Sequence, residues 1–194
     1  MSREAHVRFC EGVGVKFPCA THLIIGCELE DDAKRIMAVL PKRFSLFKLT
    51  IHPTKTKLIR FRRPPSKEVN GTFDFLGFTH FWAKTQQGYW VIKRKTAKKR
   101  LSRTMKSLWQ WCREHRHDNI SEQYKALCLK LRGHYQYYGI RSNFKMLEVV
   151  MEYTEKAWRH WLGRRSRESY ISWELFDRIR HTFPLPKPRI CHAI

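Results

Sequence analysis

The chain has 194 residues, 42% of them hydrophobic and 13% aromatic, which is enough to bury a core and argues against general disorder. Lysine and arginine number 39 against 17 acidic residues, and the formal net charge of +22 argues against an ordinary neutral surface. Charge of this size favours an anionic partner, either nucleic acid or a membrane surface.

The first half of the chain predicts short strands and one helix. Residues 1–21 show little periodicity, so we expect an irregular, poorly ordered N-terminus. A helix is expected to begin at Glu30-Asp31-Asp32, where the helix dipole favours acidic residues, and Pro41 marks its end or a kink. Strands are expected at residues 23–27, 48–51, 57–61, 72–78 and 89–92.

Beyond residue 95 the hydrophobic period changes from two residues to 3.6, which predicts helices. We expect one long helix that starts after Thr96 as its N-cap, two more at 121–138 and 143–162, and a short fourth at 173–181. Gly139 follows the second helix, where a positive φ would favour glycine, and Ser142 and Asn143 are alternative N-caps of the third.

The first of these helices carries a basic ridge. Lys99, Arg103, Lys106 and Arg113 lie opposite its apolar stripe, and no acidic residue interrupts them before Glu114. Residues 93–194 hold 24 basic and 9 acidic side chains, against 15 and 8 in residues 1–92. An ordinary solvated face is the alternative, but the lack of acids favours contact with phosphates.

The six cysteines, at positions 10, 19, 27, 112, 128 and 191, are scattered, which predicts reduced and mostly packed thiols. Cys112 with His115 and His117 lacks a second pair at structural zinc spacing, so no metal site is predicted. No apolar run reaches the roughly 18 residues of a membrane helix, and no signal peptide core is seen. We therefore expect a cytoplasmic protein that does not associate with membranes.

Three motifs, in order, resemble the C-terminal half of a group II intron reverse transcriptase/maturase, over about residues 22–190. Residues 49–57 (LTIHPTKTK) resemble the palm motif that follows the catalytic strand, and residues 73–78 (FDFLGF) resemble the primer-grip strand. Residues 131–140 (LRGHYQYYGI) resemble the signature of the maturase-specific thumb, domain X. The resemblance implies an α+β fold: a residual palm at 22–95 with a short antiparallel sheet and one helix, then an all-helical thumb bundle at 96–194.

The chain departs from this family at the catalytic site. Before the strand that ends in Ile-Gly-Cys-Glu the family has Tyr-Ala-Asp-Asp, whereas here Cys19-Ala20-Thr21-His22 stand at that place. A second alignment offers Cys10-Glu11-Gly12, which also lacks tandem acids. Palm polymerases need carboxylates for two Mg²⁺ ions, so we expect no catalytic residues, no metal and no cofactor, and no polymerase activity by the chain alone. Mg²⁺ is expected only with an intact reverse transcriptase active site, and we expect a truncated copy.

The resemblance therefore implies an RNA-binding maturase-type fragment of a mobile element, which docks on structured group II intron RNA and assists its folding and splicing. One alternative is the C-terminal piece of a split reverse transcriptase, which would need a separately encoded catalytic half. Another is a decayed remnant without function.

The residues expected to contact RNA are mostly cations of the helical half. Lys55 is included because it matches a palm lysine near the incoming nucleotide in the family. Tyr135 and Tyr138 are expected to support the surface from inside, while His134 or Tyr137 reaches outward to stack on bases. The full expected set is Lys55, Lys99, Arg103, Lys106, Lys125, Arg132, His134, Tyr137, Arg141, Arg164 and Arg165.

Overall fold

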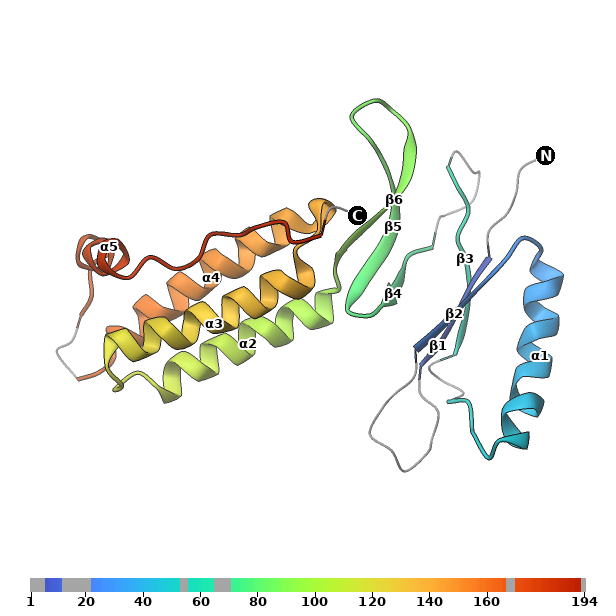
Figure 1. The fold of residues 1–194 in the computed structure, drawn as a ribbon, viewed down its shortest axis with the longest axis horizontal. Helices are drawn as coiled ribbons and strands as arrows, with labels where there is room; N and C mark the ends of the chain where they lie inside the picture. Colours follow the sequence, from blue (N-terminus) through green and yellow to red (C-terminus); the bar gives the residue numbers. More distant parts are fainter. Residues whose placement is uncertain (1–5, 12–21, 53–55, 65–70, 167–169, 193–194) are drawn as a thin grey trace. The chain divides into compact units, whose positions relative to one another are not determined.

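The computed structural model describes residues 6–11, 22–52, 56–64, 71–166 and 170–192, and within them the fold is mixed α+β, as the sequence predicts (Figure 1). The chain divides into two compact units, Met1–Arg94 and Lys95–Ile194. This division falls one residue before the expected boundary at residue 95. The assignment of the two parts as palm remnant and thumb stays a prediction.

The first unit contains a three-stranded antiparallel sheet in the order β2-β1-β3. Strand β1 (His6–Glu11) lies between β2 (His22–Cys27) and β3 (Lys57–Arg60). The expectation of an irregular N-terminus was wrong for β1, because pairing with strands on both sides satisfies the backbone groups of this segment. The other residues of the 1–21 segment lie outside the described part of the chain.

Helix α1 (Glu30–Leu46) continues through Pro41, so of the two alternatives predicted at this residue, an end or a kink, the end was wrong. The Glu30 carboxylate accepts from Lys34 and Arg60, which lower its pKa to about 2 and tie the start of α1 to the end of β3. The strand expected at 48–51 is also absent from the described structure, where only an isolated bridge occurs at Ile51. Lys48 has a φ of 55° and turns the chain after the helix.

A second sheet has the order β4-β5-β6. Its strands are β4 (Phe73–Phe75), β5 (Phe78–Lys84) and β6 (Trp90–Thr96). The single strand expected at 72–78 was wrong, because Leu76 and Gly77 have φ values of 47° and 81°. Two successive positive φ angles make a two-residue hairpin turn, and Phe75 pairs with Phe78 across it.

The hydrophobic contacts of the first unit centre on Phe61, which follows β3 and is 1% exposed. Its ring lies 5.0 Å from that of Phe73 and 5.5 Å from that of Trp82, measured between centroids. The Phe73 ring in turn stacks on His80 at 4.7 Å, and burial lowers the pKa of His80. This small aromatic cluster connects the two sheets of the unit.

The second unit consists of the expected helices, α2 (Lys98–Glu114), α3 (Ile120–Tyr138), α4 (Phe144–Leu162) and α5 (Trp173–Thr182). In Figure 1 the first three lie along one another, and residues of all three form a single core. Ser172 caps α5, accepting from the Leu175 amide at 3.2 Å. The largest fully buried side chains of this core are Trp158, Tyr135, Phe176, Leu127, Leu131, Leu147 and Leu162.

A buried polar pair joins the start of the helical unit to the junction between α3 and α4. Asn143 is fully buried, and its Oδ1 accepts from the Thr96 backbone amide at 2.7 Å. Its Nδ2 donates to the Tyr138 carbonyl at 2.9 Å and to the Thr96 hydroxyl at 2.9 Å. The prediction that Thr96 caps α2 was wrong, because Ala97 is the N-cap of that helix. Asn143 does occupy the N-cap position of α4, but its side chain makes no cap bond to that helix.

Gly139 ends α3 with a φ of −76°, so the expected positive φ was wrong. The C-terminal segment passes directly over this residue, and the Gly139 carbonyl accepts from the amides of Cys191 at 2.7 Å and His192 at 3.0 Å. A Cβ here would lie 2.2 Å from the Tyr135 carbonyl oxygen and 2.8 Å from that of Arg189. Glycine is required by the close approach of two backbones.

Two glycine substitutions within one motif are expected to have opposite effects. Gly139→Ala should destabilise the helical unit by roughly 1–3 kcal/mol, because the new methyl group overlaps backbone atoms that no rotamer change can move. Gly133→Ala should stabilise it by about 1 kcal/mol, because Gly133 is exposed inside α3 and a Cβ there meets nothing within 4 Å. Urea unfolding followed by far-UV circular dichroism measures both. Equal effects of the two changes would contradict the close-approach explanation.

Candidate nucleic-acid interface

Helix α2 presents a row of exposed cations, which we name the α2 ridge: Lys98, Lys99, Arg100, Arg103, Lys106 and Arg113. Arg113 also lies over the Trp161 ring, with its guanidinium carbon 5.8 Å from the ring centroid. None of these cations forms an ion pair with a carboxylate in the part of the chain that the structure describes. Unpaired cations on one helix are available to phosphates.

Acidic residues of the helical unit gather on α4 instead. Glu155 pairs with Arg180 at 3.0 Å, and Glu152 lies 4.0 Å from Lys156. Helix α4 packs closely against α2, but two of its three carboxylates, Glu152 and Glu155, are engaged with cations of α4 and α5. The positive charge of the α2 ridge is therefore not neutralised by its neighbour.

A hollow of about 360 Å³ lies beside the ridge, between α2 and α3. Its buried wall is apolar, and its polar groups are two cations, two hydroxyls and one imidazole. We name it the α2–α3 hollow, and its lining residues are Arg103, Thr104, Ser107, Leu108, Lys130, Leu131, His134 and Val150. Two of the predicted RNA-binding residues, Arg103 and His134, are thus brought together from different helices.

His134 is partly buried in this hollow rather than turned fully outward to stack. Its Nε2 is inaccessible and has no hydrogen-bond partner among the described residues. Its ring lies 4.6 Å from that of Tyr138, which contacts Tyr137 at 4.7 Å. Burial lowers the pKa of the imidazole to about 4, so His134 is neutral at physiological pH and adds no charge to the surface.

The buried imidazole predicts a pH dependence of stability. Because the folded pKa of about 4 lies below the ordinary value of 6.5, the unfolded chain binds more protons between these pH values. The free energy of unfolding should therefore fall as the pH is lowered from 6.5 to 4, and His134→Phe should reduce this fall. NMR titration of the His134 ring protons measures the pKa directly. An ordinary value near 6.5 would contradict burial of the ring.

On its other side the α2 ridge borders an aromatic surface shared with α4. Lys106, Trp109, Gln110 and Tyr153 line a second hollow of about 400 Å³. The Trp109 ring lies 4.7 Å from the His160 ring, 5.4 Å from the Trp161 ring and 6.4 Å from the Tyr153 ring. Aromatic groups next to a cation suit stacking with unpaired bases. We name this surface the α2–α4 hollow.

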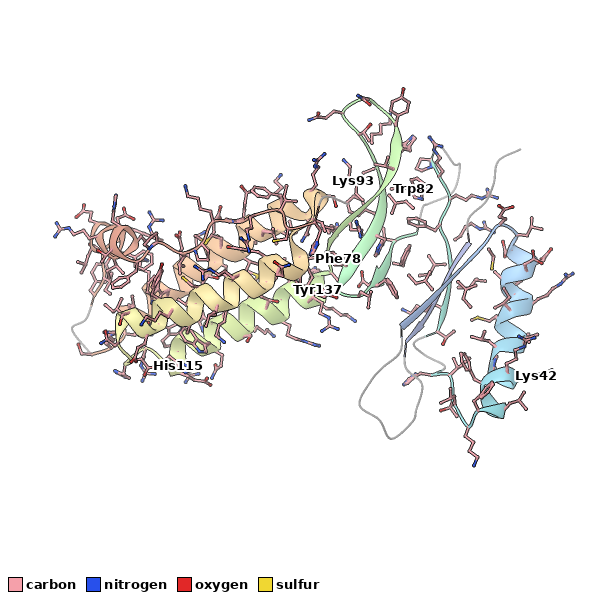
Figure 2. The ribbon with its side chains drawn as sticks, in the orientation of Figure 1. Lys42, Phe78, Trp82, Lys93, His115 and Tyr137 are labelled. Carbon is pink, nitrogen blue, oxygen red and sulfur yellow. The ribbon has the colours of Figure 1, made fainter. Side chains whose placement is uncertain are left out.

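Lys125 and Arg132 are exposed on α3, but on a different face of the helix from Lys130 and His134. Tyr137 is 52% exposed near the C-terminal end of α3, where Figure 2 labels it. Arg141 is exposed in the short 3₁₀ turn that follows. The predicted residues of α3 therefore do not form one surface.

The remaining predicted residues have mixed positions. Arg164 is exposed after α4. Arg165 is half-buried and donates from a guanidinium nitrogen to the Asp118 carbonyl at 2.8 Å, so it holds the α2–α3 loop. Lys55 lies outside the described residues. Sequence reasoning missed Arg100, Lys130, Trp109 and Tyr153; the spacing of Lys130 and His134 by four residues on α3 was the one available signal.

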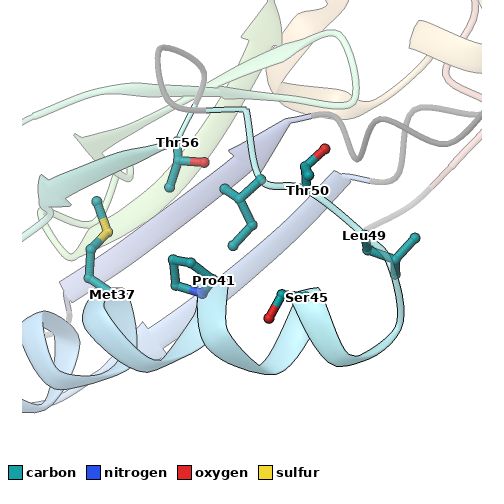
Figure 3. A pocket seen from close by; sticks show the side chains of 7 residues that line it. Met37, Pro41, Ser45, Leu49, Thr50 and Thr56 are labelled. Carbon is teal, nitrogen blue, oxygen red and sulfur yellow. The ribbon is translucent and has the colours of Figure 1, made fainter.

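The first unit has a different kind of groove, of about 390 Å³, between α1 and the segment after it (Figure 3). Its lining residues are Met37, Pro41, Ser45, Leu49, Thr50, Ile51 and Thr56. The hydroxyl of Ser45 donates to the Lys42 carbonyl at 2.7 Å, and that of Thr56 donates to the His52 carbonyl at 3.1 Å. No charged side chain is among its described lining residues, so this groove offers phosphates no cation.

Metal-ligating side chains do not gather in sets of three or more histidines, cysteines or carboxylates within the described ranges. Cys112 is buried, which raises its pKa to about 12 and keeps the thiol protonated, and His115 Nδ1 lies 3.0 Å from the Trp111 carbonyl. None of the helices described here is both long and apolar enough to traverse a lipid bilayer. The expectation that the protein needs no metal stays a prediction.

No protein-family model matches the chain, and no curated protein matches it.

Proposed function

We propose that the protein binds structured RNA, specifically group II intron RNA, and assists its folding and splicing without polymerase activity of its own. The observation that carries the proposal is the α2 ridge, whose unpaired cations lie between two hollows. The choice of group II intron RNA rests on the likeness of residues 131–140 to the maturase thumb signature.

The ridge and its flanks fit the two ways in which proteins recognise folded RNA. Cations contact phosphates and release counterions, which gives affinity without reading sequence. Aromatic groups such as Trp109 and Tyr153 stack on bases that loops and bulges leave unpaired. A protein with both features prefers a folded RNA that presents phosphates and unpaired bases together.

Filter binding to a group II intron RNA, with and without the Mg²⁺ that folds it, tests the proposal. We expect tighter binding to the folded RNA, and a log–log plot against salt with a slope of about −2 to −4, as three to five phosphate contacts would produce. A second RNA of equal length that forms only a regular duplex is the control. Affinity that does not change with salt, or equal affinity for all three RNA samples, would contradict the proposal.

A second candidate is the C-terminal piece of a split reverse transcriptase, and it is supported by the surface of the first unit. The sheet ends in β2 and β3, which have no further partner strand among the described residues. Leu46 at the end of α1 and Phe47 after it are 80% and 73% exposed, and large exposed apolar side chains favour a protein partner. The test is primer extension by this chain mixed with a fingers-and-palm half. If the mixture extends a primer no better than that half alone, the split-enzyme function is rejected.

A further inference from the structure

We propose that the α2–α3 hollow binds one unstacked nucleotide of the RNA, with its base beside His134 and its phosphate between Arg103 and Lys130. The inference rests on the proposed RNA-binding function and adds to it a subsite for a single nucleotide. It differs from contact along the ridge, which needs phosphates only.

The size and wall of the hollow suit a nucleotide. Its volume of about 360 Å³ falls in the range of roughly 300–1,000 Å³ that is typical of small-molecule sites. Leu131 and Val150 are almost completely buried and line the hollow with Leu108, so the wall is apolar. A base has apolar faces and polar edges, and an apolar wall accepts the faces.

Polar groups in the hollow can bond the edge of a base. A neutral imidazole has one nitrogen that donates and one that accepts, and the Nε2 of His134 has no described partner. Because this nitrogen is inaccessible in the unliganded chain, the ring turns toward the hollow when a base edge bonds it. A buried polar atom without a hydrogen bond is unfavourable until a ligand supplies one. The hydroxyls of Thr104 and Ser107 line the same space and both donate and accept.

Two cations from different helices complete the site. Arg103 belongs to the exposed α2 ridge, and Lys130 of α3 has its Nζ 5.3 Å from the centroid of the Trp111 ring. Both line the hollow with His134, so two positive groups border the space that a nucleotide would enter and can contact its phosphate. The combination of apolar wall, unpaired imidazole nitrogen and two cations is found at no other described hollow.

Titration of the full chain with AMP, GMP, CMP and UMP, followed by NMR of the His134 imidazole nitrogens and the Leu131 and Val150 amides, tests the subsite. We expect at least one nucleotide to shift all these signals saturably. Inorganic phosphate and ribose 5-phosphate carry the charge without a base and should leave the imidazole signals unchanged. A response to phosphate alone, equal to that of the nucleotides, would overturn the inference.

Variants separate the subsite from general charge. Lys130→Gln should weaken nucleotide binding about fivefold, as the loss of one exposed ionic contact does. Lys125→Gln removes the same charge from another face of α3 and should leave nucleotide binding unchanged. His134→Phe keeps an aromatic ring without nitrogens and should abolish the amide shifts of Leu131 and Val150. Equal effects of the two lysine changes, or unchanged binding by His134→Phe, would contradict the site.

The RNA measurement distinguishes this inference from the proposed function. If folded intron RNA binds with the expected salt dependence while no nucleotide shifts the His134 signals, the subsite is rejected and the proposed function stands. If the RNA does not bind, both are rejected.

Discussion

Replacing Lys99, Arg103 and Lys106 together by glutamine is expected to weaken binding of folded intron RNA by on the order of 100-fold at about 0.1 M salt. The three side chains are exposed on α2 and have no described carboxylate partner, so each is free to contact a phosphate. Loss of three contacts should also reduce the slope of log affinity against log salt by about two to three. Filter binding over a salt series measures both quantities.

A matched triple variant outside α2 has the same net charge as this α2 variant and serves as its control. Lys145, Lys156 and Lys187 are exposed in the same unit but outside α2, and changing all three to glutamine removes the same charge. We expect this control to change affinity only a few-fold, through the weaker long-range field. If the two variants bind RNA equally well, affinity depends on net charge alone and the α2 ridge is not the interface.

The second large effect concerns stability. Asn143→Ala should lower the free energy of unfolding of the helical unit by about 3 kcal/mol, because the Thr96 amide and the Tyr138 carbonyl lose their bonds to this side chain. The cost is large because Asn143 is fully buried and water does not replace the missing partner. Urea unfolding monitored by circular dichroism gives the value.

Two further variants make this measurement specific. Asn119→Ala removes an exposed asparagine that makes no cap bond to α3, and its effect should stay within about 0.5 kcal/mol. The double variant Thr96→Val/Asn143→Leu removes both polar side chains. The decrease in its free energy of unfolding should be smaller than the sum of the decreases caused by Thr96→Val and by Asn143→Leu separately. Strict additivity would show that the two residues do not act together.

Local patterns predicted the helical unit well. The apolar positions along α4, which include Leu147, Val150, Ala157 and Trp158, recur every three or four residues, and all four are buried. Periodicity of this kind is a property of the chain itself, because a helix places residues three and four apart on one face. Strand β2 and helix α1 were likewise predicted near their actual positions.

Several of the errors come from contacts between distant segments. Strand β1 has only a short apolar alternation, at Val7 and Phe9, and its backbone groups pair with β2 and β3 on its two sides. Thr96 was expected to cap the next helix, but its amide and its hydroxyl donate instead to the Oδ1 of Asn143, which is 47 residues away. Gly139 was expected to have a positive φ, whereas a Cβ there is excluded by the Tyr135 carbonyl of α3 and by the tail at residues 189–192.

The sequence by itself determined that this protein is strongly basic, that its second half is helical, and that one helix carries cations without acids. Net charge is a sum over the residues, and the helical pattern is a periodicity along the chain, so both can be read without the tertiary structure. Only the tertiary structure decided that Arg103, Lys130 and His134 line one hollow, and that Lys125 and Arg132 lie elsewhere. It also decided that the His134 ring is partly buried and that its pKa is lowered, because desolvation depends on what packs around a side chain.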